Sequence, residues 1–205
     1  MLWGGRMKVY FEKEIEHIYR LKIPFDTVYT SVFLVEQEGE AVMVDCATTP
    51  FDVEEYIIPA LAERGYALSS LKAIVITHGH EDHAGGLPHI LTLAPNLPVV
   101  REKVVIWENL YTYPLPGHTV DFIGLYDSRT NTLISGDGLQ GAGVDKYRCA
   151  LQDEMAYKET VRKLEEDAKV ENLLFSHAYE PWYCHHALGR EKVELCLADC
   201  LKYVN

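Results

Sequence analysis

The spacing of hydrophobic and polar residues along the chain predicts a mixture of strands and helices. Short apolar runs at residues 41–45 and 73–77 are typical of buried strands, and residues 27–36 give a strand signal because their core is rich in β-branched and aromatic residues. Shorter strand signals lie at residues 8–11, 99–100, 104–107, 120–126, 132–135 and 172–176. Helical signals lie at residues 51–64, 86–93, 153–168 and 188–203. Because strands and helices do not alternate strictly, we expect sheets with helices on their outer faces and not a doubly wound parallel sheet.

One predicted strand, residues 73–77, leads directly into a cluster of potential metal ligands. Residues 77–86 read THGHEDHAGG and place three imidazoles and one carboxylate within six residues. A strand end is a rigid support, and the glycines allow the following loop to turn sharply. Imidazole nitrogen and carboxylate oxygen suit zinc, iron or manganese, and no thiolate is needed. The pattern therefore predicts a metal site at this strand end.

The same segment resembles the signature of the metallo-β-lactamase-fold hydrolases. Three further motifs of that family follow in order, namely Pro116-Gly117-His118-Thr119, Ser135-Gly136-Asp137 and Ser176-His177. The resemblance covers about residues 28–181. It implies an α/β fold of four layers, an αβ/βα sandwich in which two mixed sheets face each other, helices cover both outer faces and the metal site lies at one edge. Residues 1–205 are then expected to form a single catalytic domain.

The resemblance also implies a centre of two divalent ions, with zinc the first expectation and iron or manganese the alternatives. The implied ligands are His78, His80 and His118 for the first ion, Asp82, His83 and His177 for the second, and Asp137 for both. Asp45 matches the family's aspartate that orients a ligand histidine by accepting its remaining N–H. The alternative role for Asp45 is the formation of a turn. The resemblance further implies that a hydroxide bridging the two ions, oriented by Asp82, would attack a carbonyl or phosphoryl centre.

The residues after Asp137 bear on the substrate. Residues 138–147 resemble the segment of hydroxyacylglutathione hydrolases (glyoxalase II) in which a Cys-Gly-Lys triplet meets the glutathione moiety. Lys146 matches the lysine and Tyr147 an aromatic residue, although Val144-Asp145 replace Cys-Gly. Lactonases of the family carry a tyrosine shortly after the bridging aspartate, a role that Tyr147 or Tyr179 could fill here. We therefore predict Lys146, Tyr147 and Tyr179 as substrate-binding residues, with a solvated surface lysine as the alternative for Lys146.

Composition and charge narrow the classes of partner. The 205-residue chain is 48% hydrophobic and 24% charged, as in folded globular proteins. Its 19 basic and 31 acidic residues give a net charge of −12, which repels phosphate backbones and anionic membranes. The five cysteines form no CxxC pair, the start lacks the pattern of a secretory signal, and no apolar run approaches the roughly 20 residues that span a bilayer. We expect a cytoplasmic protein with free thiols and a small-molecule substrate, with neither nucleic acid nor membrane as partner.

The sequence thus predicts a dinuclear metal-dependent hydrolase of a small-molecule ester, thioester or lactone, with a thioester slightly favoured by Lys146. One alternative is an oxidoreductase resembling the persulfide dioxygenases, which hold one iron with two histidines and an aspartate; His78, His118 and Asp137 could supply that set. Another is a non-catalytic metal-binding module, against which the intact ligand set argues. The oligomeric state stays open.

Other residues are predicted to contribute to packing or to the surface. Core packing is favoured over a substrate wall for the aromatic residues Trp107, Tyr111 and Tyr113. A third metal site at His185 and His186 is conceivable, but neighbouring residues on a helix seldom share an ion. We therefore favour a surface or packing role for both histidines.

Overall fold

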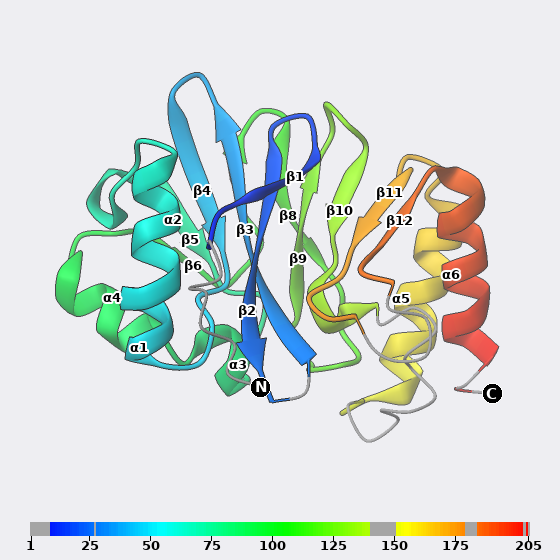
Figure 1. The fold of residues 1–205 in the computed structure, drawn as a ribbon. Helices are drawn as coiled ribbons and strands as arrows, with labels where there is room; N and C mark the ends of the chain where they lie inside the picture. The colour runs from blue at the N-terminus through cyan, green and yellow to red at the C-terminus, as the bar shows by residue number, and fades with distance from the viewer. Residues whose placement is uncertain (1–8, 27, 140–150, 179–183, 203, 205) are drawn as a thin grey trace, which may run out of the picture.

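The computed structural model describes residues 9–26, 28–139, 151–178, 184–202 and 204. Within these residues the chain forms two six-stranded sheets that face each other, with helices on both outer faces (Figure 1). Each sheet contains both parallel and antiparallel pairs. The expected four-layer αβ/βα sandwich is confirmed. No helix in the described part of the chain is long and apolar enough to cross a bilayer.

The first sheet has the strand order β1-β2-β3-β4-β5-β6. Its strands are β1 (Glu12–Ile15), β2 (Ile18–Phe25), β3 (Val28–Gln37), β4 (Glu40–Val44), β5 (Ala73–Val75) and β6 (Val99–Val100). The pairs β4–β5 and β5–β6 are parallel, so helical crossovers must connect these strands. The helical segments on the outer face of this sheet include α1 (Pro50–Asp52), a π-helical turn (Val53–Ile57), α2 (Ile58–Glu63) and α4 (Leu87–Leu93), and a 3-10 turn (Leu68–Ser70) precedes β5 in the sequence. The short helix α3 (Glu81–Ala84) lies at the lower edge of the sheets in Figure 1.

The second sheet has the strand order β12-β11-β10-β9-β8-β7. Its strands are β7 (Val105–Trp107), β8 (Leu110–Pro114), β9 (Ile123–Asp127), β10 (Thr132–Ile134), β11 (Asn172–Leu174) and β12 (His186–Leu188). Among the described strands of this sheet, β10 and β11 are the one parallel pair, and α5 (Glu154–Glu166) lies between them in the sequence. Helix α5 and the C-terminal helix α6 (Arg190–Lys202) cover the outer face of this sheet (Figure 1).

Three apolar clusters hold the layers together. One lies between the first sheet and its helices, one between the second sheet and α5 and α6, and one between the two sheets. Strand β3 shows how one sequence serves two clusters. Val32 and Leu34 point to the helices, whereas Phe33 and Val35 point to the second sheet. Because both faces of this strand are buried, residues 32–35 form an apolar run without polar alternation.

The structure corrects several predicted boundaries. A strand over residues 8–11 is wrong for the described positions 9–11, since the first strand begins at Glu12. Strands β2, β8 and β12 were missed. Strand β2 has the sequence IYRLKIPF, in which charged residues and a proline interrupt the apolar pattern although Arg20 is fully buried. Helix α6 begins at Arg190 and not at residue 188, because residues 186–188 pair with β11 and Gly189 then adopts a φ of 92°.

Arg20 links the two sheets from a fully buried position on β2. Its Nε donates to Glu14 Oε1 at 2.7 Å, and its terminal nitrogens donate to Ser31 Oγ at 2.6 Å and to the carbonyl oxygens of Phe175 and His185. Ser31 Oγ in turn donates to the carbonyl oxygen of Ser176 at 2.6 Å. The guanidinium therefore holds the segment that leads out of β11 against the first sheet.

Replacing Arg20 by methionine is expected to lower the free energy of unfolding by about 3–5 kcal/mol, because it leaves a buried carboxylate without its cation. Denaturant unfolding measures the change. The matched control is Arg64→Met, which removes an Arg–Glu pair with Glu36 whose side chains are 25% and 20% exposed. That change should cost about 1 kcal/mol or less. Equal stability of the two variants would contradict the role assigned to Arg20.

Candidate metal centre

The centre forms where loops from both sheets meet. Residues 76–86 follow β5 and include α3, which begins after His80. His118 lies on the loop between β8 and β9, Asp137 lies in a short 3-10 turn after β10, and His177 follows β11. Residues distant in the sequence thus meet at one edge of the sandwich only when both sheets have assembled.

The glycines after the ligand cluster allow a close approach of two backbone segments. A Cβ on Gly85 would lie 2.1 Å from Thr48 O, and one on Gly86 would lie 2.3 Å from Cys46 O. Hydrogen bonds join the same segments, from Cys46 N to His83 O at 2.8 Å and from Gly86 N to Ala47 O at 3.1 Å. The expectation of a sharp turn at the glycines is wrong for Gly85, whose φ of −65° is helical. Glycine is required there for space.

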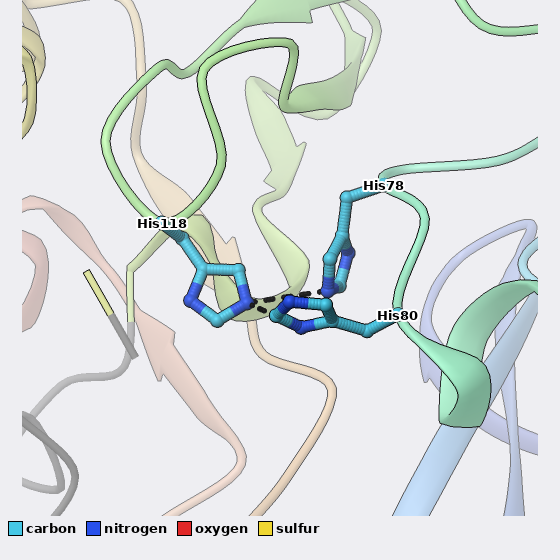
Figure 2. Close-up of side chains that lie close together, drawn as sticks. All are labelled: His78, His80 and His118. Atoms are coloured by element: carbon cyan, nitrogen blue, oxygen red, sulfur yellow. Dashed lines mark hydrogen bonds between the residues drawn. The ribbon is translucent and has the colours of Figure 1, made fainter. Parts of the chain in front are cut away.

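The first group of ligand-type atoms consists of three histidines. Figure 2 shows the rings of His78, His80 and His118 pointing toward one another from two loops. The Nε2 atom of His118 lies 3.2 Å from His78 Nε2 and 3.1 Å from His80 Nδ1. A single proton on His118 Nε2 can be donated to only one of these nitrogens, whereas a cation between the three rings can accept a lone pair from each.

The orientation of His78 is set by the residue that precedes it. Thr77 Oγ1 donates to Asp45 Oδ2 at 2.9 Å and therefore accepts from His78 Nδ1, which lies 3.1 Å away. We assign the proton to Nδ1 on this basis, which leaves the Nε2 lone pair of His78 directed at the centre. Phe122 stacks on the same ring, with centroids 4.9 Å apart.

The second group consists of Asp82, His83, Asp137 and His177. Nε2 of His83 lies 3.2 Å from Asp82 Oδ2 and 3.3 Å from Asp137 Oδ2. Nε2 of His177 lies 3.2 Å from Asp82 Oδ2 and 3.3 Å from Asp137 Oδ1. Nδ1 of His177 is 2.7 Å from the carbonyl oxygen of Tyr29, which can only accept, so this nitrogen carries a proton. A neutral His177 therefore presents its Nε2 lone pair to the two carboxylates.

Two buried atoms of this group test whether a cation fits. Among the described residues, His83 Nε2 and Asp137 Oδ1 make no hydrogen bond of acceptable geometry, although His83 Nε2 lies 3.3 Å from Asp137 Oδ2 and Asp137 Oδ1 lies 3.3 Å from His177 Nε2. Buried polar atoms without a hydrogen bond are rare in folded proteins. A divalent cation among the four side chains would satisfy both, because carboxylate oxygens and imidazole nitrogens are its usual ligands. The residues present therefore fit a metal ion.

Asp137 belongs to the second group and also approaches the first. Its Oδ2 atom is 3.3 Å from His83 Nε2 and 3.7 Å from His118 Nε2, so one carboxylate reaches a histidine of each group. In each group the ligand-type atoms lie within 4.8 Å of one another. The structure thus brings together all seven residues predicted as ligands. Apart from His80, which is exposed, and Asp82, which is partly exposed, their side chains are buried.

The electrostatics of the two groups differ. Burial and the surrounding imidazoles lower the pKa of His78 to about 2, so this ring is neutral at physiological pH. Burial alone would lower the pKa of His177, but the Asp137 and Asp82 carboxylates outweigh it and raise the pKa to about 9. Burial alone would raise the pKa of Asp82, but the adjacent imidazoles of His177 and His83 outweigh it and hold this pKa well below its usual range. The ionised carboxylates of Asp82 and Asp137 are thus stabilised by positive charge close by. A bound cation can provide that charge in place of the protons on the histidines.

Comparison with known proteins agrees with this fold. The family model described as the metallo-beta-lactamase superfamily matches residues 25–109. Among solved structures, the metallo-β-lactamase FIM-1 from Pseudomonas aeruginosa, in its mono-zinc form, superposes with a TM-score of 0.72 at 18% sequence identity and with 97% of each chain covered. The chain thus has the metallo-β-lactamase fold, and the family model matches less than half of its residues. At this low identity the structural likeness shows the fold alone.

Curated relatives of this metallo-β-lactamase-fold protein have different activities. A ribonuclease J of Mycolicibacterium smegmatis is 39% identical over 75 residues, covering 35% of this chain and 13% of that protein. A hydroxyacylglutathione hydrolase of Methylobacillus flagellatus is 31% identical over 130 residues, covering 55% and 48%. An atrochrysone carboxyl ACP thioesterase of Emericella nidulans is 26% identical over 151 residues, covering 66% and 47%. The matched regions thus span about half, or much less, of these relatives.

Asp45 is not among the seven ligand-type residues, but its hydrogen bonds connect the first group with the second. Its carboxylate is fully buried and accepts from Thr77 N at 2.8 Å, from Thr77 Oγ1 and from His83 Nδ1, the last at 2.8 Å. It therefore orients His83 directly and His78 through Thr77. Thr77 was not singled out from the sequence, although its place directly before the ligand cluster is a signal that could have found it.

Asp45→Asn should weaken zinc binding by about 10- to 100-fold, because the amide removes the charge that fixes both rings. Competition with a chromophoric chelator measures the affinity. Asp52→Asn is the matched control. Asp52 is a buried residue of α1 that completes the helix's capping box by accepting from Thr49 N at 2.8 Å, and its replacement should leave zinc affinity unchanged. Equal affinities of the two variants would show that Asp45 does not orient the ligands.

The remaining predicted site residues lie elsewhere or are not described. Lys146, Tyr147 and Tyr179 fall outside the described residues. Tyr111 and Tyr113 pack on the cluster beneath α5 and α6, and Trp107 packs on the cluster between the sheets. These placements agree with the core role favoured for the three aromatic residues.

Proposed function

We propose that this chain is a metal-dependent hydrolase that acts on a small-molecule ester, thioester or lactone. The observation that carries the proposal is the arrangement of seven imidazole and carboxylate side chains in two adjoining groups, with Asp137 between them. Curated relatives that are hydrolases, among them a thioesterase, support it. Two groups joined by one carboxylate favour a two-ion centre over the single iron of the dioxygenase alternative.

Two divalent ions, zinc in the first place, would be held by the two groups and would supply a hydroxide nucleophile at neutral pH and positive charge for the developing oxyanion. The protein's own contribution begins with Asp82. Its side chain is 14% exposed against 7% for Asp137, so it is the carboxylate nearer to solvent. We assign Asp82 to accept a hydrogen bond from the attacking water and thereby orient it. His80 is exposed, so we expect the substrate to enter from its side.

The class of bond is proposed from two further observations. The names of the relatives include a thioesterase and a hydroxyacylglutathione hydrolase, and the segment with Lys146 resembles that of the latter family. The ribonuclease J match is confined to 75 residues. A net charge of −12 disfavours a polyanionic substrate, so we propose a small thioester over a nucleic acid.

A substrate panel tests the proposal. Zinc-loaded protein is assayed on acyl-glutathione thioesters, aryl esters, N-acyl homoserine lactones and bis-aryl phosphodiesters, and iron-loaded protein on a glutathione persulfide with oxygen uptake recorded. The expected result is the highest kcat/KM on a thioester. Failure of the fully loaded protein on every carbonyl substrate would overturn the proposal, as would iron-dependent oxygen uptake without hydrolysis.

A further inference from the structure

A separate cluster of ligand-type side chains lies where the edge strand of one sheet meets the edge strand of the other. Glu14 belongs to β1, His186 is the first residue of β12, and His185 directly precedes it. His186 Nδ1 lies 3.0 Å from Glu14 Oε2, and His185 Nε2 lies 3.5 Å from Glu14 Oε1. The two imidazole rings are 4.5 Å apart between centroids, and one ligating atom from each of the three residues lies within 4.8 Å of the others.

We propose that Glu14, His185 and His186 form an accessory metal site for a zinc ion or a similar divalent transition metal. Two imidazoles and a carboxylate are a donor set that zinc accepts, with water completing the coordination. His186 lies in a strand and His185 directly precedes that strand, so the geometry that keeps neighbours on a helix from sharing an ion does not hold for this pair.

The three side chains are preorganised as ligands. The Glu14 side chain is only 5% exposed, and its ion pair with the buried Arg20 fixes it in the ionised form. Burial and the nearby Arg20 charge lower the pKa of His185 to about 4, so its ring is neutral at pH 7. The His185 and His186 side chains are 25% and 33% exposed, so an ion can reach the cluster from solvent.

The ion pair between Arg20 and Glu14 also affects how tightly the cluster would bind zinc. Arg20 occupies Oε1 of Glu14 and leaves Oε2, which faces His186, as the oxygen directed at the ion. Because the guanidinium already neutralises the carboxylate, the local charge attracts a cation less than the central site does. A third equivalent of zinc should therefore bind more weakly than the two central ones.

Binding at this site would add a link between the two sheets close to the segment that carries His177. Glu14 lies on the first sheet, whereas His186 pairs with Leu174 in the second sheet, three residues before His177. A shared ion would add a connection between the sheets to the one that Arg20 makes through the His185 carbonyl oxygen. The expected consequence is a zinc-dependent rise in thermal stability after the central sites are filled.

The test is a zinc titration of the full chain, followed by calorimetry and by the unfolding temperature. The wild type should bind a third, weaker equivalent with a second rise in the unfolding temperature. His185→Ala and His186→Ala should each lose that equivalent and that rise while they retain the first two. The matched control is His89→Ala, which removes a histidine that pairs with Glu54 at 2.8 Å on the surface and should keep all three. Absence of a third equivalent in the wild type at millimolar zinc, or its persistence in both histidine variants, would overturn the proposal.

Discussion

Replacing Asp137 by asparagine should lower kcat/KM on the order of 1,000-fold or more, the largest effect expected of any single change. Its Oδ1 faces His177 Nε2 at 3.3 Å, and its Oδ2 faces both His83 Nε2 and His118 Nε2. An amide of the same shape places an N–H donor at one of these positions and removes the negative charge that a shared cation requires. Turnover and bound metal per chain are the two measurements.

Asp127→Asn is the matched control for this variant. Asp127 is also a buried aspartate that faces a histidine, with its Oδ2 atom 2.7 Å from His17 Nε2, but it lies at the end of β9 outside the candidate centre. Its replacement should cost stability and leave kcat and metal content unchanged. If Asp137→Asn kept both its metal and its turnover, Asp137 would not link the two groups.

Gly85→Ala should lower the free energy of unfolding by about 3 kcal/mol or more. The added Cβ would meet Thr48 O at 2.1 Å and Glu81 O at 2.5 Å, and both atoms belong to the backbone and cannot rotate away. Relief requires α3 to move, and this helix carries Asp82 and His83. Loss of metal from the second group should accompany the loss of stability. Thermal unfolding and metal content report the two effects.

The control for this change lies within the same motif. A Cβ on Gly79 would have no heavy atom within 4 Å, so Gly79→Ala should leave the free energy of unfolding nearly unchanged. A similar, small effect of both substitutions would contradict the assignment of Gly85 to close backbone packing.

The sequence predicted the elements whose buried positions carry apolar residues. Strand β3 is buried on both faces and therefore shows an apolar run, and α5 carries a periodic apolar stripe toward the second sheet. Strand β2 was missed because Arg20, which reads as a surface residue, is fully buried against Glu14 and backbone oxygens of the other sheet. Hydrophobic periodicity cannot anticipate a buried charge, since its burial depends on partners distant in the sequence.

The candidate centre was predictable for a different reason. Its ligands lie at strand ends in short motifs, so the resemblance to the family located all seven, and the assembled sheets bring them together. The roles of Thr77 and of the cluster around Glu14 depend on hydrogen bonds and strand neighbours that only the folded chain defines. The predicted roles of Lys146, Tyr147 and Tyr179 stay predictions, as does the cytoplasmic location.

Titration of the metal-free chain with zinc, with thioester hydrolysis recorded at each addition, tests the central claim most directly. The two ligand groups predict no hydrolysis without metal, a rise with occupancy, and a plateau once two tightly bound equivalents are present per chain. Full hydrolysis by the metal-free chain, or binding of zinc to both groups without any hydrolysis, would contradict a two-ion hydrolase.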